Sequence, residues 1–200
     1  MYSFLLASIA LTISPGPDIL YVMTQSISNG KKFGIATAAG LVSGILVHTT
    51  LIALGISAVL KQSEMVFTAI KILGACYLLW IAFQVYKAPS SITFSKEGSP
   101  QKSVRALFKQ GFIMNVLNPK VTLFFLAFFP GFIDESLGNV TQQIYFLGFL
   151  FMLQAFLIFS FVSIVADQLT IFIRTNQRFA LFLKWLQIVV FVGIAVLILG

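Results

Sequence analysis

The sequence predicts an all-α integral membrane protein with six transmembrane helices, arranged as two inverted repeats of three helices each. Three observations lead to this fold class. Of the 200 residues, 58% are hydrophobic and 10% are charged, whereas a soluble domain is about half apolar and about a quarter charged. Six mainly apolar runs are long enough to cross roughly 30 Å of hydrocarbon. Basic residues gather in alternate connectors between these runs, as six full crossings require.

The apolar runs justify the expected helices in order along the chain. They span approximately 3–26, 36–60, 65–86, 111–132, 141–166 and 179–200. Pro15 and Pro17 interrupt the first run, and Pro119 interrupts the fourth beside Lys120. Since a proline inside a helix removes one backbone hydrogen bond, we expect the first helix of each repeat to be broken at these prolines.

The charges of the connectors predict the orientation in the membrane. One set of connectors is poor in positive charge and holds Lys61, Glu64, Asp134 and Glu135. The positive-inside rule places the other set in the cytoplasm, and both termini then face the periplasm of a bacterial inner membrane. This basic set comprises Lys31, Lys32, Lys87, Lys96, Lys102, Arg105, Lys109, Arg174, Arg178 and Lys184. A competing five-crossing topology turns the fourth run into a re-entrant hairpin, and the acidic connector at 134–135 disfavours it.

The longest connector, 87–110, is rich in Ser, Pro, Lys and Gly and predicts a flexible cytoplasmic linker. It divides one transmembrane domain, residues 1–200, into a first repeat over about 1–86 and a second over about 111–200. An odd number of crossings in each half makes the repeats inverted, and interrupted helices at corresponding positions indicate a binding site near the midplane. Residues 1–13 carry no Lys or Arg, so we expect no cleaved signal peptide.

Asp18 and Lys120 are the strongest candidate site residues, because each lies inside an apolar run directly after a proline. A charge at the bilayer centre costs about 2.5–3.5 kcal/mol on insertion scales. Backbone groups freed by the prolines are tolerated at that depth only inside protein or beside a hydrated cavity. We therefore expect the two residues to face each other. Either they bind the zwitterionic head of a substrate, or Asp18 carries the coupling proton. The alternative is a permanent ion pair that locks the broken helices together.

Further polar residues lie at membrane depth beside this pair. His48, the only histidine, shares a helical face with Gly40, Gly44 and Gly55, and the first two glycines form a GxxxG pattern that lets helices approach closely. The histidine either packs through a hydrogen bond or relays protons. Asn115 and Asn118 either bind a substrate carboxylate or cap the broken helix. The helix-break motifs themselves are Pro15, Gly16, Pro17 and Pro119.

Other kinds of chemistry lack their residues. The chain has no GxxxxGK phosphate loop, no GxSxG elbow and no HExxH motif. Its single cysteine, Cys76, cannot build a multi-cysteine metal site. The basic residues follow the connectors rather than a stripe, so nucleic acid is not an expected partner. We expect a transporter and not an enzyme, with no cofactor and no metal.

These motifs together resemble the superfamily of lysine and homoserine–threonine exporters, over essentially the whole chain. The matching stretches are Ser14-Pro15-Gly16-Pro17-Asp18, Gly30-Lys31-Lys32-Phe33-Gly34, 40–48 with Gly55, Gly111-Phe112, Asn115, Asn118-Pro119-Lys120 and Phe129-Pro130-Gly131-Phe132. Many members of the family have Asn where this chain has Asp18, and the Asp form looks like the threonine-exporter branch.

The resemblance implies export of a small neutral polar amino acid, threonine- or homoserine-like, with the proton-motive force as the usual driver. Its expected partners are the amino-acid substrate, protons and the lipid bilayer, and a homo-oligomer stays open. Within the family both five and six crossings have been described. The alternative function is an exporter or passive channel for another small solute or ion.

Overall fold

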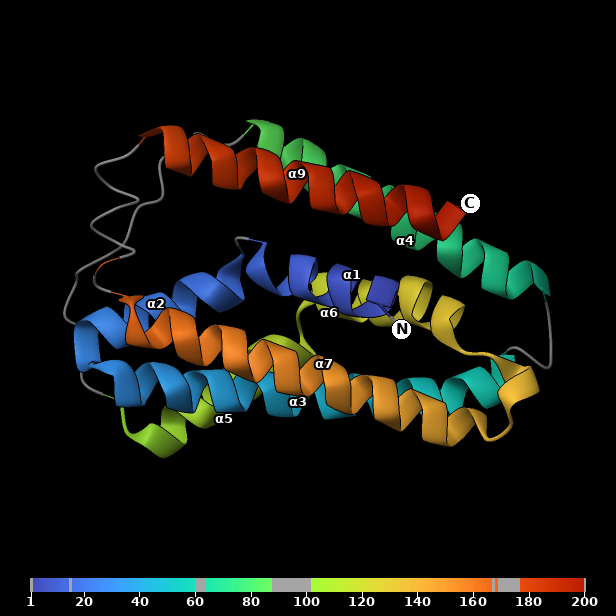
Figure 1. The fold of residues 1–200 in the computed structure, drawn as a ribbon, viewed down its shortest axis with the longest axis horizontal. Coiled ribbons are helices and arrows are strands. Elements are labelled where there is room, and N and C mark those ends of the chain that lie inside the picture. Colours follow the sequence, from blue (N-terminus) through green and yellow to red (C-terminus); the bar gives the residue numbers. More distant parts are fainter. Residues whose placement is uncertain are drawn as a thin grey trace.

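The protein is a bundle of helices that run side by side along one long axis (Figure 1). The computed structural model describes residues 2–14, 16–59, 64–87, 102–166, 168 and 177–199, and every regular element among them is helical. The all-α fold class is therefore confirmed. The elements are α1 (Tyr2–Ile13), α2 (Pro17–Asn29), α3 (Lys31–Val59), α4 (Glu64–Lys87), α5 (Val104–Val116), α6 (Pro119–Leu123), the π-helical turn η1 (Phe124–Phe128), the 3₁₀ turns η2 (Phe129–Phe132) and η3 (Glu135–Leu137), α7 (Val140–Ile164) and α9 (Gln177–Leu199).

Candidate membrane spans number three to five among the described residues. Three single helices are long and apolar enough: Lys31–Gly55, Val140–Ile164 and Leu181–Leu199. Two bent pairs pass the same test together, α1 with α2 at 54° and α5 with the segment from α6 to η2 at 46°. The arrangement of six crossings in two inverted repeats stays a prediction. Pro15, Lys61, Lys96 and Arg174, on which parts of that prediction depend, lie outside the described residues.

The second bent helix begins earlier than the composition predicted. α5 starts at Val104, inside the connector expected to be a flexible linker through residue 110. The Ser103 side chain accepts a hydrogen bond from the Ala106 amide at 3.2 Å and caps the helix, and Leu107 is fully buried. Because Lys102 precedes the cap and Arg105 lies in the first turn, the polar composition of this stretch hid a capped helix start.

The connector between α2 and α3 is a single residue. Gly30 lies between them with φ at +98°, a conformation that L side chains rarely adopt. The Gly30 amide also donates to the Ser26 carbonyl at 2.8 Å, which satisfies one of the last free carbonyls of α2. The chain therefore reverses direction sharply, and α2 packs against the beginning of α3.

α3 is the central helix, because α2, α5 and α7 all pack against it. Gly40 faces the carbonyl oxygen of Phe108 on α5, and Gly44 faces the side chain of Asn115 on the same helix. A Cβ atom at either glycine would overlap these atoms. The close approach predicted from the GxxxG pattern is confirmed, and its partner is the helix that leads to the second break.

α4 and α9 form a separate pair beside this group. They pack against each other over much of their length and contact the remaining helices mainly through α1 and η1. Figure 1 shows the pair diverging from the bundle toward the end where α2 meets α3. The aromatic rings of Tyr86 on α4 and Trp185 on α9 contact each other there, with centroids 6.1 Å apart.

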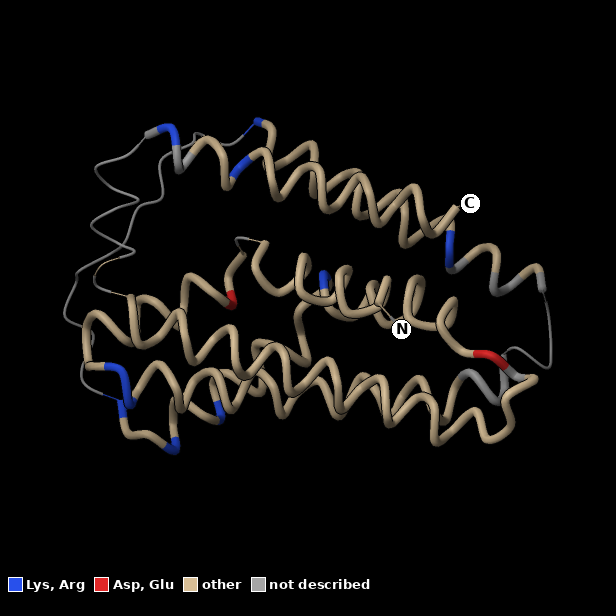
Figure 2. Tube along the Cα trace, in the orientation of Figure 1, with Lys and Arg blue, Asp and Glu red and all other residues tan. Residues whose placement is uncertain are grey.

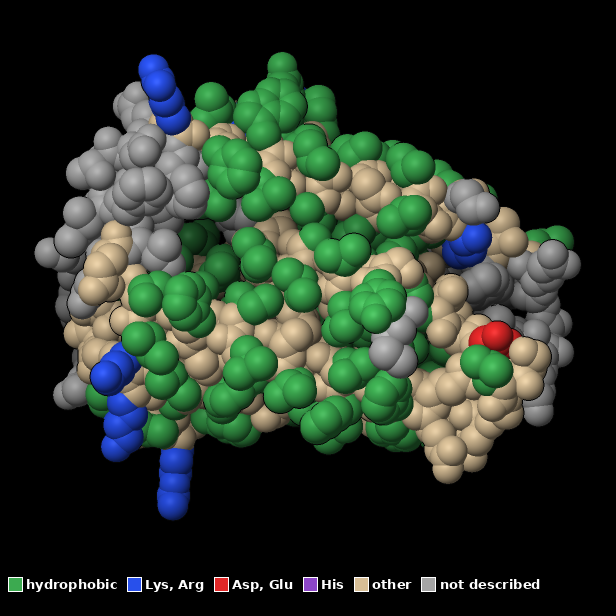
Figure 3. Space-filling view, viewed as in Figure 1, with side chains coloured by type: hydrophobic (Ala, Val, Ile, Leu, Met, Phe, Trp, Pro, Cys, Tyr) green, Lys and Arg blue, Asp and Glu red, His purple; other side chains and the backbone are tan. Residues whose placement is uncertain are grey.

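The outer surface is apolar over most of the face shown in Figure 3. Side chains more than half exposed on α7 and α9 include Phe149, Leu157, Phe161, Val189, Val196 and Leu197. Large continuous apolar patches of this kind are rare on soluble monomers and indicate contact with a membrane or a partner. Lys and Arg residues instead gather where α2 meets α3 and where α5 begins, whereas the acidic segment after η2 lies at the opposite end (Figure 2).

A substitution at the crossing of α3 and α5 tests this packing. Gly40→Ala places a methyl group against the Phe108 backbone carbonyl, which cannot move unless the helices separate. We expect a loss of about 1–3 kcal/mol in the free energy of unfolding, because the contact becomes overpacked. Thermal unfolding in detergent measures the change.

Gly193→Ala on α9 is the matched control, because no atom lies within 4 Å of the added Cβ. It should leave the midpoint unchanged or raise it slightly, since alanine favours a helix over glycine. Equal midpoints for the two variants would show that α3 and α5 are not in close contact.

Candidate functional site

The first helix break brings a carboxylate to the start of α2. α1 ends at Ile13, and Gly16 lies in an extended conformation as the N-cap of α2. Pro17 occupies the first position of α2, where a missing amide proton leaves no hydrogen bond unmade. Asp18 follows in the first turn of α2 and is 8% exposed. The break expected in this run is therefore present, and it places Asp18 inside the bundle.

The second break joins the first through an asparagine. α5 ends at Val116, and Asn118 caps α6 by accepting a hydrogen bond from the Lys120 amide at 3.0 Å. The amide nitrogen of the same Asn118 side chain donates to Asp18 Oδ2 at 2.6 Å. One buried side chain thus caps a helix in the second half and holds the carboxylate of the first half.

Lys120 reaches across in the other direction. Its Nζ donates to the carbonyl oxygen of Ser14, just beyond the end of α1, at 3.1 Å. It also lies 5.6 Å from the ring centre of Phe191 on α9. A helix carries partial negative charge at its C-terminus and partial positive charge at its N-terminus. Lys120 at the end of α1 and Asp18 at the start of α2 therefore each lie beside a helix end of opposite sign.

Asp18 and Lys120 do not form the permanent ion pair that one sequence interpretation proposed. Each charged group has a different hydrogen-bond partner, Asn118 for Asp18 and the Ser14 carbonyl for Lys120. Within the described residues no direct ion pair joins the two. Hydrogen bonds from Asn118 and Lys120 hold the breaks together, and part of each charged group stays available for other contacts.

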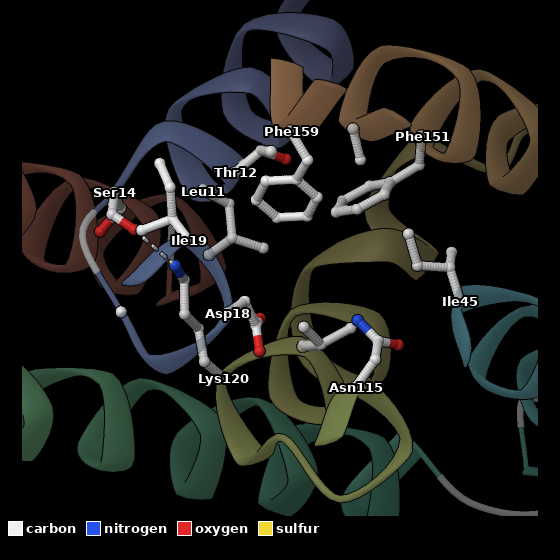
Figure 4. A pocket seen from close by; sticks show the side chains of 13 residues that line it. Leu11, Thr12, Ser14, Asp18, Ile19, Ile45, Asn115, Lys120, Phe151 and Phe159 are labelled. Atoms are coloured by element: carbon white, nitrogen blue, oxygen red, sulfur yellow. Dashed lines mark hydrogen bonds between the residues drawn. The ribbon is translucent and has the colours of Figure 1, made fainter. Parts of the chain in front are cut away.

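Both groups line one small cavity between the broken helices and α7 (Figure 4). The cavity volume is about 20 Å³, which leaves room for about one water molecule. An amino acid does not fit into it in this conformation. The residues that line the cavity are Leu11, Thr12, Ser14, Gly16, Asp18, Ile19, Ile45, Asn115, Lys120, Val121, Phe151, Ala155 and Phe159.

Three of the lining residues carry a buried polar atom without a hydrogen-bond partner. They are Asp18 Oδ1, Asn115 Oδ1 and Ser14 Oγ. Leaving such an atom unpaired costs about 1–3 kcal/mol, and more for a charged group. Native proteins keep few of these atoms, and a cluster of them beside a cavity is expected where a ligand, water or proton binds.

His48 and Asn118 lie behind the cavity rather than in its wall. His48 Nε2 is 3.1 Å from the carbonyl oxygen of Asn115, and its ring packs at 5.6 Å from that of Phe125. The packing interpretation accounts for these contacts, whereas a proton relay through His48 stays a prediction. Of the predicted site residues, the structure brings Asp18, Asn115, Lys120 and Gly16 into the cavity wall.

The sequence interpretation missed the contribution of α7 and α1 to this cavity. Phe151, Ala155 and Phe159 recur every fourth residue on α7 and line it. Thr12 of α1 also lines it and accepts a hydrogen bond from the Gln154 side chain at 3.0 Å. α7 is apolar on all sides, so no single position stood out, although a polar Gln154 beside Ala155 was a usable signal.

A comparison with known families identifies the chain. The profile described as LysE type translocator matches residues 9–200. The chain belongs to this family.

Three known relatives match this LysE type translocator in sequence over most of its length. It is 31% identical to the homoserine/homoserine lactone efflux protein of Salmonella typhimurium, over 92% of this chain and 83% of the relative. It is 30% identical to the uncharacterized membrane protein YrhP of Bacillus subtilis, over 93% of this chain and 91% of that protein. The homoserine/homoserine lactone efflux protein of Salmonella typhi is also 30% identical to it, over 92% of this chain and 83% of that protein. No solved structure matches the chain.

Family and fold together establish a multi-pass membrane protein that translocates a small molecule. Membership in a translocator family points away from an enzyme. The two broken helices and the cavity between them are the features of the chain that fit this activity.

The double role of Asn118 can be measured against a second asparagine cap. Asn118→Ala removes a helix cap, worth about 1 kcal/mol, and a buried hydrogen bond to a carboxylate, worth about 1.5–3 kcal/mol. Asn139→Ala removes only the exposed cap of α7, which accepts from the Gln142 amide at 3.2 Å. We expect Asn118→Ala to lower the free energy of unfolding by at least about 1.5 kcal/mol more than Asn139→Ala.

Denaturant or thermal unfolding in detergent compares the two variants. If they lose the same stability, the bond from Asn118 to Asp18 does not hold the two breaks together.

Proposed function

We propose that this protein exports a small neutral polar amino acid, threonine- or homoserine-like, across a bacterial inner membrane and uses the proton-motive force. The single observation that carries the proposal is the cavity that Asp18 and Lys120 both line at two helix breaks, with Asp18 Oδ1 unpaired. The names of the Salmonella relatives support amino-acid efflux. Bacterial relatives and apolar helices support the inner membrane.

The charges of the cavity suit the two ends of a zwitterion. A substrate ammonium group can donate to Asp18 Oδ1, which has no hydrogen-bond partner among the described residues. A substrate carboxylate can accept from the Lys120 ammonium group, once that group exchanges the Ser14 carbonyl for the stronger charged acceptor. A basic side chain would find no second acid among the lining residues. The cavity therefore favours a neutral amino acid over lysine or arginine.

Proton coupling follows if the proton and the substrate compete for the same carboxylate. On the acidic periplasmic side, a proton on Asp18 removes the charge that holds the substrate ammonium group, and the substrate leaves. The protonated site then turns toward the more alkaline cytoplasm, where Asp18 loses the proton and binds a new substrate. A ligand shifts an equilibrium only by its differential affinity for the two states, and Asp18 provides that difference here.

A conformational change must accompany this cycle, because the cavity holds about 20 Å³ and the substrate needs several times more. Transporters with interrupted helices alternate access by rocking one group of helices against another around a midplane site. Here the basic end of the bundle would face the cytoplasm, and α1 begins and α9 ends in the opposite half (Figures 1 and 2).

The role of Asp18 is tested by Asp18→Asn in proteoliposomes. This variant keeps the shape of the side chain but neither binds an ammonium group strongly nor carries a proton. Losing one partner of a buried charged contact costs about 2–5 kcal/mol, so we expect at least about a 30-fold loss of export driven by an imposed proton gradient. Asp134→Asn, at an exposed site between η2 and η3, is the control and should export normally.

The same vesicles, preloaded with a panel of amino acids, separate the alternatives. Normal export by Asp18→Asn at normal expression would remove Asp18 from the mechanism. Flux that ignores an imposed proton gradient would identify a passive channel. If the wild-type protein moves no amino acid, the proposed function is wrong.

A further inference from the structure

One face of α7 closes the cavity opposite the charged groups. Phe151, Ala155 and Phe159, called here the α7 wall, follow one another at intervals of four residues and so lie on one side of the helix. Their side chains are 3%, 1% and 5% exposed, although neighbours such as Phe161 on the same helix are 63% exposed. The wall is therefore an inward-facing surface of the bundle and not part of its lipid-facing surface.

The cavity has a polar side and an apolar side. Figure 4 shows the Asp18 carboxylate and the Asn115 amide on one side and the rings of Phe151 and Phe159 on the other. All three residues that α7 contributes are apolar. The broken helices contribute every charged group that lines the cavity. A bound molecule with two charged ends and a side chain is thus oriented by the difference between the two sides.

From this geometry we infer that the α7 wall is the specificity surface of the transporter, which selects substrates by the length of their uncharged side chain. The inference rests on the proposed function, because it needs an amino acid whose charged groups bind Asp18 and Lys120. With the charged ends held there, the side chain of the substrate points toward α7. Ala155, the smallest residue of the wall, then forms a notch between two rings.

The contacts behind the wall keep it in a defined shape. The ring of Phe151 packs against those of Phe124 and Phe125 at centroid distances of 5.4 and 5.5 Å. Gln154, next to Ala155, donates to Thr12 on α1 and so ties α7 to the first broken helix. A surface supported in this way cannot yield freely to a longer side chain. The wall should therefore discriminate by length, and it offers no charge to a basic or acidic side chain.

Ala155→Val fills the notch and tests the inference. The substrates are serine, homoserine and 5-hydroxynorvaline, which differ by one methylene group each and keep the hydroxyl group. One methylene in an apolar pocket changes discrimination by about 10-fold or more. We expect Ala155→Val to lower the ratio of homoserine to serine export by about tenfold. Ala195→Val is the control, because Ala195 on α9 is equally buried and does not line the cavity.

Phe159→Leu opens the wall and tests it in the opposite sense. A shorter side chain at this position leaves more space, so the ratio of 5-hydroxynorvaline to serine export should rise severalfold. Phe161→Leu makes the same substitution on the lipid-facing side of α7 and should leave every ratio unchanged. Thermal midpoints in detergent show which variants are folded. If Ala155→Val does not fold, Phe159→Leu decides alone.

The outcomes separate this inference from the proposed function. Opposite shifts in the two ratios, with both controls unchanged, support the α7 wall as the specificity surface. If the wall variants scale the export of all three substrates by one factor, the inference is overturned while amino-acid export stands. If the wild-type protein exports none of the amino acids in a wider panel, the proposed function fails and the inference fails with it.

Discussion

Two interrupted helices in this protein are joined by side-chain hydrogen bonds, and the rest of the site depends on these bonds. Asn118 caps α6 and holds Asp18 at the start of α2, while Lys120 binds the Ser14 carbonyl beyond the end of α1. Inside a bilayer no water is available to satisfy a broken helix. Asn118 satisfies the start of its own helix, and Lys120 satisfies a carbonyl at the end of α1 from the opposite half. These bonds bring an acid and a base together inside the bundle.

These bonds satisfy some backbone groups at the helix ends but not every polar atom near them. Oxygen atoms of Asp18, Asn115 and Ser14 stay buried and unpaired. Each would cost about 1–3 kcal/mol if it stayed unpaired, and the cavity beside them has room for a water molecule. In a transporter such groups are useful, because a group that is fully satisfied by the protein gains nothing from a substrate or a proton. The unpaired atoms are consequently the part of the site that capping does not explain.

Packing divides the helices into groups that differ in how tightly they are joined. α3 is pressed against α5 at glycines whose missing side chains admit backbone contact, so the second break is anchored to the central helix. α4 and α9 pack on each other and meet the rest mainly at α1 and η1. Lys120 lies beside Phe191 of α9 as well as Ser14. The charged site thus lies at the boundary between the two groups, where relative movement would change its contacts.

Local rules made much of this structure predictable from the sequence. Pro17 and Pro119 determine where helices break, and the length and hydropathy of α3, α7 and α9 determine candidate spans. Ser103 concealed the start of α5, because a capped polar turn resembles a linker in composition. Only the tertiary structure decided that Asn118 binds Asp18, that Lys120 binds Ser14 instead of Asp18, and that α7 lines the cavity. The two hydrogen bonds join residues about a hundred positions apart. α7 carries apolar residues on all of its sides, and Gln154 alone does not define a face, so only packing selects which face turns inward.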